Sequence, residues 1–205
     1  LLVVADLKQY EADPAAYLAT HPLPLRDEQL KYNERNTEWK FDDFIEPLQT
    51  ALKNRAFDVG KATFNVASCT ACHRLNEVGK EFGPDLSKLD PIKFTPENIL
   101  RSILTPSDEI NETFQTYTFL LDSGKIVIGT IVEETATTVS VIVDPLAEAT
   151  PIVIPKGEIE GRKKSNVSIM PIGLLSKLTQ EEILDLIAYV YARGDRNHAA
   201  FSECH

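Results

Sequence analysis

The sequence predicts a mainly α fold into which a small antiparallel β meander or barrel is inserted, an α+β arrangement. Apolar residues recur at helical spacing up to Leu104, at every second position from Phe114 to about Arg162, and at helical spacing again afterwards. The period therefore changes twice along the chain. These changes divide it into an N-terminal leader or extension (1–40), a first helical part (41–113), a β insertion (114–162) and a second helical part (163–205).

The first predicted helix covers residues 41–52, with an apolar face at helical spacing made by Phe41, Phe44, Ile45, Leu48 and Leu52. Pro47 lies inside this run and predicts a kink or a second start. A shorter helix follows, with Asp58 as its expected N-cap, and carries Gly60 and Phe64 towards a pair of cysteines.

Two further helices have clear start signals. One begins with Thr95 followed by Pro96, and its expected buried side is Ile99, Leu100, Ile103 and Leu104. The last helix begins with a capping box of Thr179 and Glu182, and Gly194 follows it as a C′ glycine. Its apolar face is Ile183, Leu186, Ile187 and Val190. The stretch between the second and third helices, 79–91, is predicted to be a loop because it is rich in Gly and Pro.

The middle of the chain alternates as strands do. After a first strand with Tyr117, Phe119 and Leu121 on one side, Asp122-Ser123-Gly124 forms a turn. The following β-branched runs are 125–132, 137–143 and 152–154, with 158–162 as a candidate fifth strand. Pro151 and Pro155 bracket one run, which therefore belongs at an edge of the sheet. Four or five short strands predict a small meander or a partly closed barrel.

Composition and charge exclude some classes of protein. The net charge is −10 and no stripe of Lys and Arg is present, so a nucleic-acid partner is not expected. The single basic cluster, GRKKS at 161–165, is interpreted as a solvated strand end. No apolar run is long enough to span a membrane. The sequence begins at Leu1, so we interpret it as a mature or excised piece, and a missing signal peptide says nothing about its compartment.

The motif that carries chemistry is SCTACHRL (68–75), in which His73 directly follows the pair Cys69 and Cys72. A thioredoxin-type redox pair should stand where a strand enters a helix, whereas this pair ends a short helix. A zinc site needs four donors, and the remaining Cys204, His205, His198 and His21 are terminal or scattered. Covalent c-type haem needs two thiols for the vinyl groups and an adjacent His as proximal iron ligand, which this motif supplies.

A haem used for electron transfer needs a second axial ligand and a fixed proximal ring. Met170, the single methionine, lies in the loop SIMPIGLL before the last helix and is the predicted ligand. The alternatives are a methionine that fills a gap in the core, or His198, His205 or His21 as ligand. The carbonyl of Pro84, in FGPDL, is a candidate acceptor for the second ring nitrogen of His73, although its stretch equally predicts a simple turn.

Two stretches resemble the cytochrome c superfamily: GKATFNVASCTACHRLNEVGKEFGPDL, which carries the CxxCH motif, and SIMPIGLLSKLTQEEILDLIAYVYARGD, which carries Met170. With ILTPSDEI, DSGKIVIGTIVEET and GDRNHAAF, they are similar to the haem-binding domain of large secreted proteins of planctomycetes and verrucomicrobia. The likeness runs from about Asp13 to Phe201. In that family the domain commonly closes a longer chain that carries a dehydrogenase-like propeller or helical repeats.

The resemblance implies one haem c (iron) per chain, held by Cys69 and Cys72, in the periplasm or another extracytoplasmic compartment. His73 and Met170 would be the axial ligands. Gly60 would let its helix approach the last helix closely. The residues expected to contact the cofactor are Phe64, Pro84, Leu86, Ile103 and Tyr189. Cys204 and His205 match nothing in the family.

The predicted function is electron transfer and not catalysis, because two axial ligands leave no iron site open to a substrate. The expected partner is a dehydrogenase, fused in the parent chain or separate. The competing class is a haem enzyme or a gas or redox sensor in which Met170 leaves the iron. No distal His or Arg suited to peroxide cleavage stands at a readable position, which favours the carrier. The β insertion is interpreted as scaffold, with a docking platform for sugar or protein as the alternative.

Overall fold

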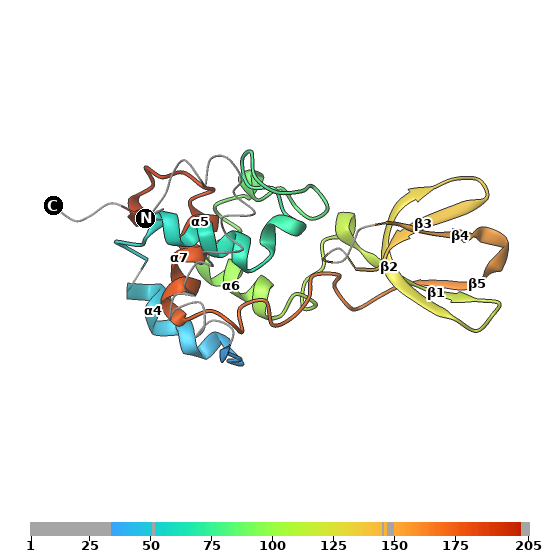
Figure 1. Cartoon of the computed structure of the whole chain (residues 1–205), viewed down its shortest axis with the longest axis horizontal. Coiled ribbons are helices and arrows are strands. Elements are labelled where there is room, and N and C mark those ends of the chain that lie inside the picture. Colours follow the sequence, from blue (N-terminus) through green and yellow to red (C-terminus); the bar gives the residue numbers. More distant parts are fainter. Residues whose placement is uncertain (1–33, 51, 145, 147–149, 202–205) are drawn as a thin grey trace, which may run out of the picture. The chain divides into compact units, whose positions relative to one another are not determined.

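The structure is a computed structural model that describes residues 34–50, 52–144, 146 and 150–201 (Figure 1). The chain divides into two compact units, Leu1–Arg35 and Asn36–His205, and the description below concerns the second. Most of the predicted leader, residues 1–33, lies outside the described residues, as do Cys204, His205 and His21. Among the residues described, no helix combines the length and the apolar character that crossing a membrane requires.

The prediction of a mainly α, cytochrome c-like fold is wrong, although the antiparallel sheet expected within it is present. Of the described residues 35% are helical and 20% lie in strands, so the fold is α+β with a five-stranded antiparallel sheet. All five candidate strands find partners. Part of the helical content is made of short 3₁₀ turns, because several apolar runs are interrupted too early to form long helices.

The first predicted helix is split in two. A 3₁₀ turn, η1 (Phe41–Phe44), is followed by α4 (Ile45–Thr50), so that Pro47 falls in the first turn of α4, where a proline is tolerated. Phe44 and Leu48 are buried as expected, but Ile45 is 44% exposed because the break rotates it away from the core.

The next helix, α5 (Phe57–Val66), begins one residue before the predicted N-cap. Ala56 occupies the N-cap position, so the assignment of Asp58 as N-cap is wrong. Asp58 lies in the first turn and pairs with Arg196, an arrangement that also suits a helix N-terminus, where negative charge is favourable. The Arg196 guanidinium lowers the pKa of Asp58.

The two remaining helices match the start signals of the sequence. α6 (Pro96–Leu104) is capped by Thr95, whose hydroxyl accepts from the amide of Asn98 at 3.3 Å. α7 (Gln180–Tyr191) has the predicted capping box, in which Thr179 Oγ1 accepts from Glu182 N at 3.3 Å and Glu182 Oε2 accepts from Thr179 N at 2.7 Å. Within α6, Ile99 and Leu100 are buried, whereas Ile103 and Leu104 are half-buried.

Helices α5 and α7 cross in contact with each other (Figure 1). Gly60 lies in this contact. A Cβ on Gly60 would lie 2.3 Å from the backbone oxygen of Asp185 and 2.8 Å from Cβ of Tyr189. Every residue of α7 from Ile183 to Val190 is buried. The two helical parts of the chain therefore meet through this crossing, as the resemblance implied for Gly60.

The inserted sheet consists of β1 (Thr116–Leu121), β2 (Ile126–Glu134), β3 (Thr138–Ile142), β4 (Ile152–Pro155) and β5 (Ile159–Lys164). Its strand order is β4-β3-β2-β1-β5, all antiparallel. β4 is at an edge, as its prolines predicted. The sheet is not a simple meander, because β5 returns to pair with β1. β5 ends at Lys164, two residues beyond the predicted end of the insertion.

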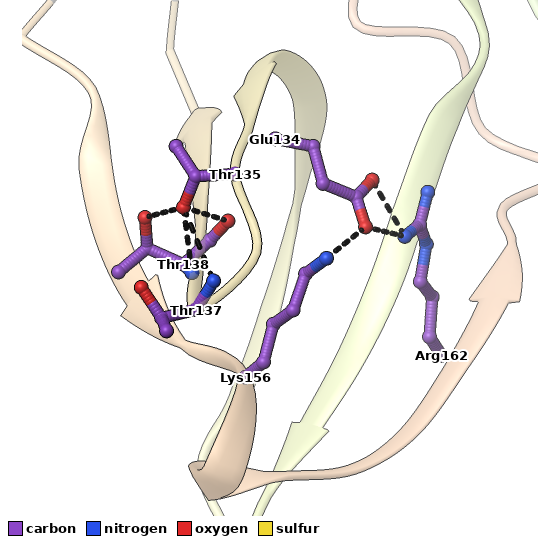
Figure 2. A network of polar contacts seen from close by, with 6 residues as sticks. All are labelled: Glu134, Thr135, Thr137, Thr138, Lys156 and Arg162. Carbon is purple, nitrogen blue, oxygen red and sulfur yellow. Dashed lines mark hydrogen bonds and ion pairs between the residues drawn. The ribbon is translucent and has the colours of Figure 1, made fainter.

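The sheet is curled so that its two edge strands can be joined directly. Only a three-residue turn, η5 (Lys156–Glu158), separates β4 from β5, although they lie at opposite edges. In Figure 2 the carboxylate of Glu134 lies between Lys156 Nζ at 2.9 Å and Arg162 Nη1 at 3.0 Å. Arg162 also stacks on Tyr117, 4.6 Å from the ring centroid, and covers the end of the apolar core.

Candidate functional site

The CxxCH motif begins where α5 ends. Ser68 has a left-handed backbone with φ 62°, which turns the chain from α5 into η2 (Cys69–Ala71). The carbonyl of Cys69 then accepts from the amides of Cys72 at 3.2 Å and His73 at 2.8 Å. This single turn brings the two cysteines and the histidine into one compact segment.

Both cysteines of the motif are free thiols. Burial raises the pKa of Cys69 to about 12, and burial also raises the pKa of Cys72, partly offset by the charge of Lys80. Nucleophilic cysteines of disulfide oxidoreductases have lowered pKa values, because the thiolate is the reactive form. The raised pKa values therefore count against a thioredoxin-type redox pair.

The imidazole of His73 is held by the carbonyl predicted for it. Nδ1 lies 3.0 Å from the backbone oxygen of Pro84, so Nδ1–H donates and Nε2 keeps its lone pair. Burial lowers the pKa of His73, and the bond to Pro84 opposes this in part. The ring is therefore neutral at pH 7 and presents one nitrogen that is able to bind a metal ion.

Two glycines lie against this histidine, and neither was predicted from the sequence to be a site residue. A Cβ on Gly83 would lie 2.9 Å from Cε1 and 3.0 Å from Nδ1 of His73. Gly79, at φ 100°, lies against the backbone of His73, where an added Cβ would be 2.0 Å from its carbonyl oxygen. The available signal was the position of Gly83 directly before Pro84, since a tight approach to the ring needs a residue without a side chain.

Backbone hydrogen bonds fasten the loop after Gly79 onto the motif. Lys80 N donates to Thr70 O at 3.1 Å, Gly83 N to Cys72 O at 2.6 Å, and Leu86 N to Arg74 O at 2.8 Å. Leu86 then opens the short turn η3 (Leu86–Lys88), capped by the carboxylate of Asp85. Pro84 and Leu86, both predicted site residues, are therefore brought to His73 by main-chain pairing.

The aromatic pair predicted to flank the cofactor lies at the helix crossing. The ring centroids of Phe64 and Tyr189 are 5.8 Å apart, and both side chains are buried. The two residues contribute to the lining of an open pocket of about 370 Å³, together with Thr70 and Val78. Burial raises the pKa of Tyr189, so its hydroxyl stays protonated.

Met170 lies in the irregular stretch between β5 and α7 and is half-buried. Its amide donates to Ser168 Oγ at 3.2 Å, and the amide of Ser168 donates to Ser107 Oγ at 3.1 Å. These bonds fix the loop to the segment that follows α6. The assignments of His73 and Met170 as axial ligands of a haem iron stay predictions.

A metal site built from the protein alone is not present in the part of the chain that the structure describes: no three His, Cys, Asp or Glu side chains are grouped to hold an ion. The zinc alternative is not tested by this, because three of its candidate donors, His21, Cys204 and His205, lie outside the described residues. This absence also has no bearing on a haem iron, because the porphyrin supplies most of the iron's ligands.

No family model matches the chain, and none of the curated proteins compared with it is significantly similar. Family membership and function therefore rest on the residues of the chain itself.

Proposed function

We propose that this chain is a monohaem c-type cytochrome domain of the cytochrome c superfamily, which carries single electrons. The observation that supports this most strongly is the hydrogen bond from His73 Nδ1 to the carbonyl of Pro84. Gly83 lies against the same imidazole ring. A histidine that ligates a metal usually donates its second ring N–H in this way, which orients the ring and raises its basicity.

The donor set fits a covalently attached haem. Cys69 and Cys72 are free and half-buried, and addition to the two vinyl groups needs free thiols. They stand on one turn with His73, whose Nε2 is available as proximal ligand. When bound, haem c supplies an iron that changes between the ferric and ferrous states.

The chain's own residues would hold and tune this centre. Pro84 and Gly83 fix the plane of the proximal ring, and Met170 is the proposed distal ligand. A thioether favours ferrous iron and so raises the reduction potential compared with a second histidine. The apolar side chains Phe64, Leu86, Ile103 and Tyr189 would favour the ferrous state further, because they exclude water from the more positive ferric centre.

The proposal includes a compartment and a partner. Covalent haem attachment of this type, like the family resemblance, favours the periplasm or another extracytoplasmic compartment. The partner would be a redox protein or a dehydrogenase domain, fused to this chain or separate. Nucleic acid is not expected as a partner, because the chain has a net charge of −10.

Expression in a bacterial periplasm together with a c-type haem maturation system tests the proposal. We expect the chain to stain for haem after denaturing electrophoresis, and Cys69→Ala with Cys72→Ala to abolish the stain. Cys204→Ser is the matched control and should leave it unchanged. A wild-type chain that folds but carries no covalent haem would refute the proposal.

The distal ligand is tested separately by visible spectroscopy of the ferric chain. We expect a thioether-to-iron charge-transfer band that disappears in Met170→Ala while the covalent stain remains. A high-spin spectrum in the wild type would instead favour the alternative, a haem enzyme or a gas or redox sensor with an open site.

A further inference from the structure

Asn76 joins three segments that are far apart in the sequence. Its side-chain Nδ2 donates to the backbone carbonyl of Arg193 at 3.0 Å, just past the end of α7. Its amide donates to Ser87 Oγ at 2.6 Å, and its carbonyl accepts from Arg74 Nε at 2.8 Å. The residue therefore connects the segment that follows His73 with η3 and with the C-terminus of α7.

The backbone around Asn76 is built for this contact. Leu75 and Val78 exchange both backbone hydrogen bonds, at 2.8 and 3.1 Å, so Asn76 occupies a tight turn. It has φ 54°, a left-handed conformation that asparagine tolerates better than most residues. Asparagine therefore meets the needs of the turn and of the side-chain donor together.

The partner segment leaves room for the amide. Gly194 has φ 70°, and a Cβ there would lie 2.6 Å from Asn76 Nδ2. The carbonyl that Asn76 reaches belongs to Arg193, which directly follows the C-cap residue Ala192 of α7. The same helix carries Tyr189 and crosses α5 at Gly60.

We propose that Asn76 is a positioning residue: its amide ties the turn behind His73 to the end of α7, so that the orientation of the proximal imidazole is coupled to that helix. The coupling runs through Leu86, whose amide bonds to Arg74 two residues before Asn76, and so to Pro84. The choice of His73 as the group to be oriented rests on the proposed haem site.

Two variants of the full chain test the coupling by amide hydrogen exchange. Asn76→Asp keeps the shape and tolerates positive φ but cannot donate to the Arg193 carbonyl, and Asn76→Gly removes the amide while keeping the turn. The matched control is Asn54→Asp, since Asn54 has the same left-handed backbone, φ 58°, outside the site. We expect exchange at Val78 and Leu86 to rise about fivefold in both Asn76 variants, as the loss of one hydrogen bond implies, and not in the control. Unchanged exchange would overturn the proposal.

Nitrogen NMR of the His73 ring separates positioning from plain stabilisation. In the chain made without haem attachment, the wild type should show one tautomer with the proton on Nδ1, and both Asn76 variants a mixture. In the haem-loaded chain the ferric EPR g values should shift in the same variants. Faster exchange with an unchanged ring tautomer would overturn the positioning role. A wild-type chain that never stains for haem would refute the proposed function alone, because exchange and tautomer are measured without haem.

Discussion

At the scale of single residues, the candidate site depends on a glycine, which has no Cβ, as much as on the side chains that are present. His73 is oriented by a backbone carbonyl 3.0 Å away and by the absence of a Cβ on Gly83. A Cβ on Gly83 would meet two atoms of the ring and the Cys72 carbonyl, so a side chain there would press on the imidazole. Small substitutions here should therefore act on the imidazole directly.

Gly83→Ala tests this contact. The new Cβ would meet Cε1 and Nδ1 of His73 at 2.9–3.0 Å, so the ring must shift and its bond to Pro84 must lengthen. We expect the free energy of unfolding to fall by about 1–3 kcal/mol, the usual cost of an overpacked site. Gly157→Ala is the control, since nothing lies within 4 Å of the added Cβ. Urea titrations that find equal effects would contradict the steric explanation.

Asp185 gives a pH-dependent prediction. Burial raises the pKa of this carboxyl, opposed by the Ala56 amide at 3.0 Å and by Arg55 at 3.5 Å. A raised pKa means that the folded chain holds the proton more tightly than the unfolded chain does. The contribution of protonated Asp185 to the free energy of unfolding is therefore complete below the unfolded pKa near 3.8. It is lost as the pH rises through the pKa of Asp185 in the folded chain. Relative to Asp185→Asn, the wild type should lose stability in urea titrations as the pH rises above the unfolded pKa. A difference that stays constant or grows with pH would contradict the sign.

At the scale of secondary-structure elements, the crossing of α5 and α7 holds the two helical parts of the chain together. Gly60 lies against backbone and Cβ atoms of α7, which cannot rotate away as the end of a long side chain could. The aromatic contacts of Tyr189 with Phe57 and Phe64, at 5.3 and 5.8 Å between centroids, flank the same point. Close packing at this crossing outweighs the weak helix propensity of glycine.

Gly60→Ala distinguishes packing from propensity by the sign of its effect. Propensity alone would stabilise α5 by about 1 kcal/mol, whereas a Cβ 2.3 Å from the Asp185 carbonyl should give a net loss of about 1–3 kcal/mol. Ala62→Gly, at an exposed position of the same helix, should cost about 1 kcal/mol from propensity alone. If Gly60→Ala raised the midpoint of urea unfolding, the crossing would have room for a methyl group, and the packing explanation would be wrong.

At the scale of the whole molecule, the sheet has a core of its own. Its buried side chains all come from strands: Phe119, Leu121, Val127, Val139, Val141 and Ile154. The entry and exit of the insertion are adjacent, since Ser165 N donates to Thr116 O at 2.9 Å and Gln115 Nε2 donates to Ser165 O at 2.8 Å. Two neighbouring chain ends are what an excisable insertion requires.

Removal of residues 117–164, with a short Gly-Ser linker in their place, tests this independence. We expect helical circular dichroism and covalent haem staining to survive, because the described contacts of the His73 ring come from residues outside the sheet. The full-length chain, expressed in parallel, is the reference. A shortened chain that is unfolded would show that the helical part needs the sheet, and the scaffold interpretation would then be wrong.

Local patterns in the sequence determined the elements that depend on neighbouring residues. Thr95 and Thr179 predicted the starts of α6 and α7, and alternation predicted the strands, since a cap or a pleat is set within a few positions. The CxxCH motif and its candidate carbonyl, Pro84, were likewise readable. Asp58 and Ile45 were misplaced because a one-residue shift in a helix start or break changes which face a side chain occupies.

Only the tertiary structure decided the contacts between distant segments. The return of β5 to β1, the fit of Gly83 against His73 and the reach of Asn76 to Arg193 join residues that no short pattern relates. The proportions of helix and strand also depended on which β-branched segments paired in a sheet. All five did, and the fold is α+β for that reason. A sequence encodes local backbone preferences directly, whereas close approach depends on how separate segments pack, which is a property of the folded chain.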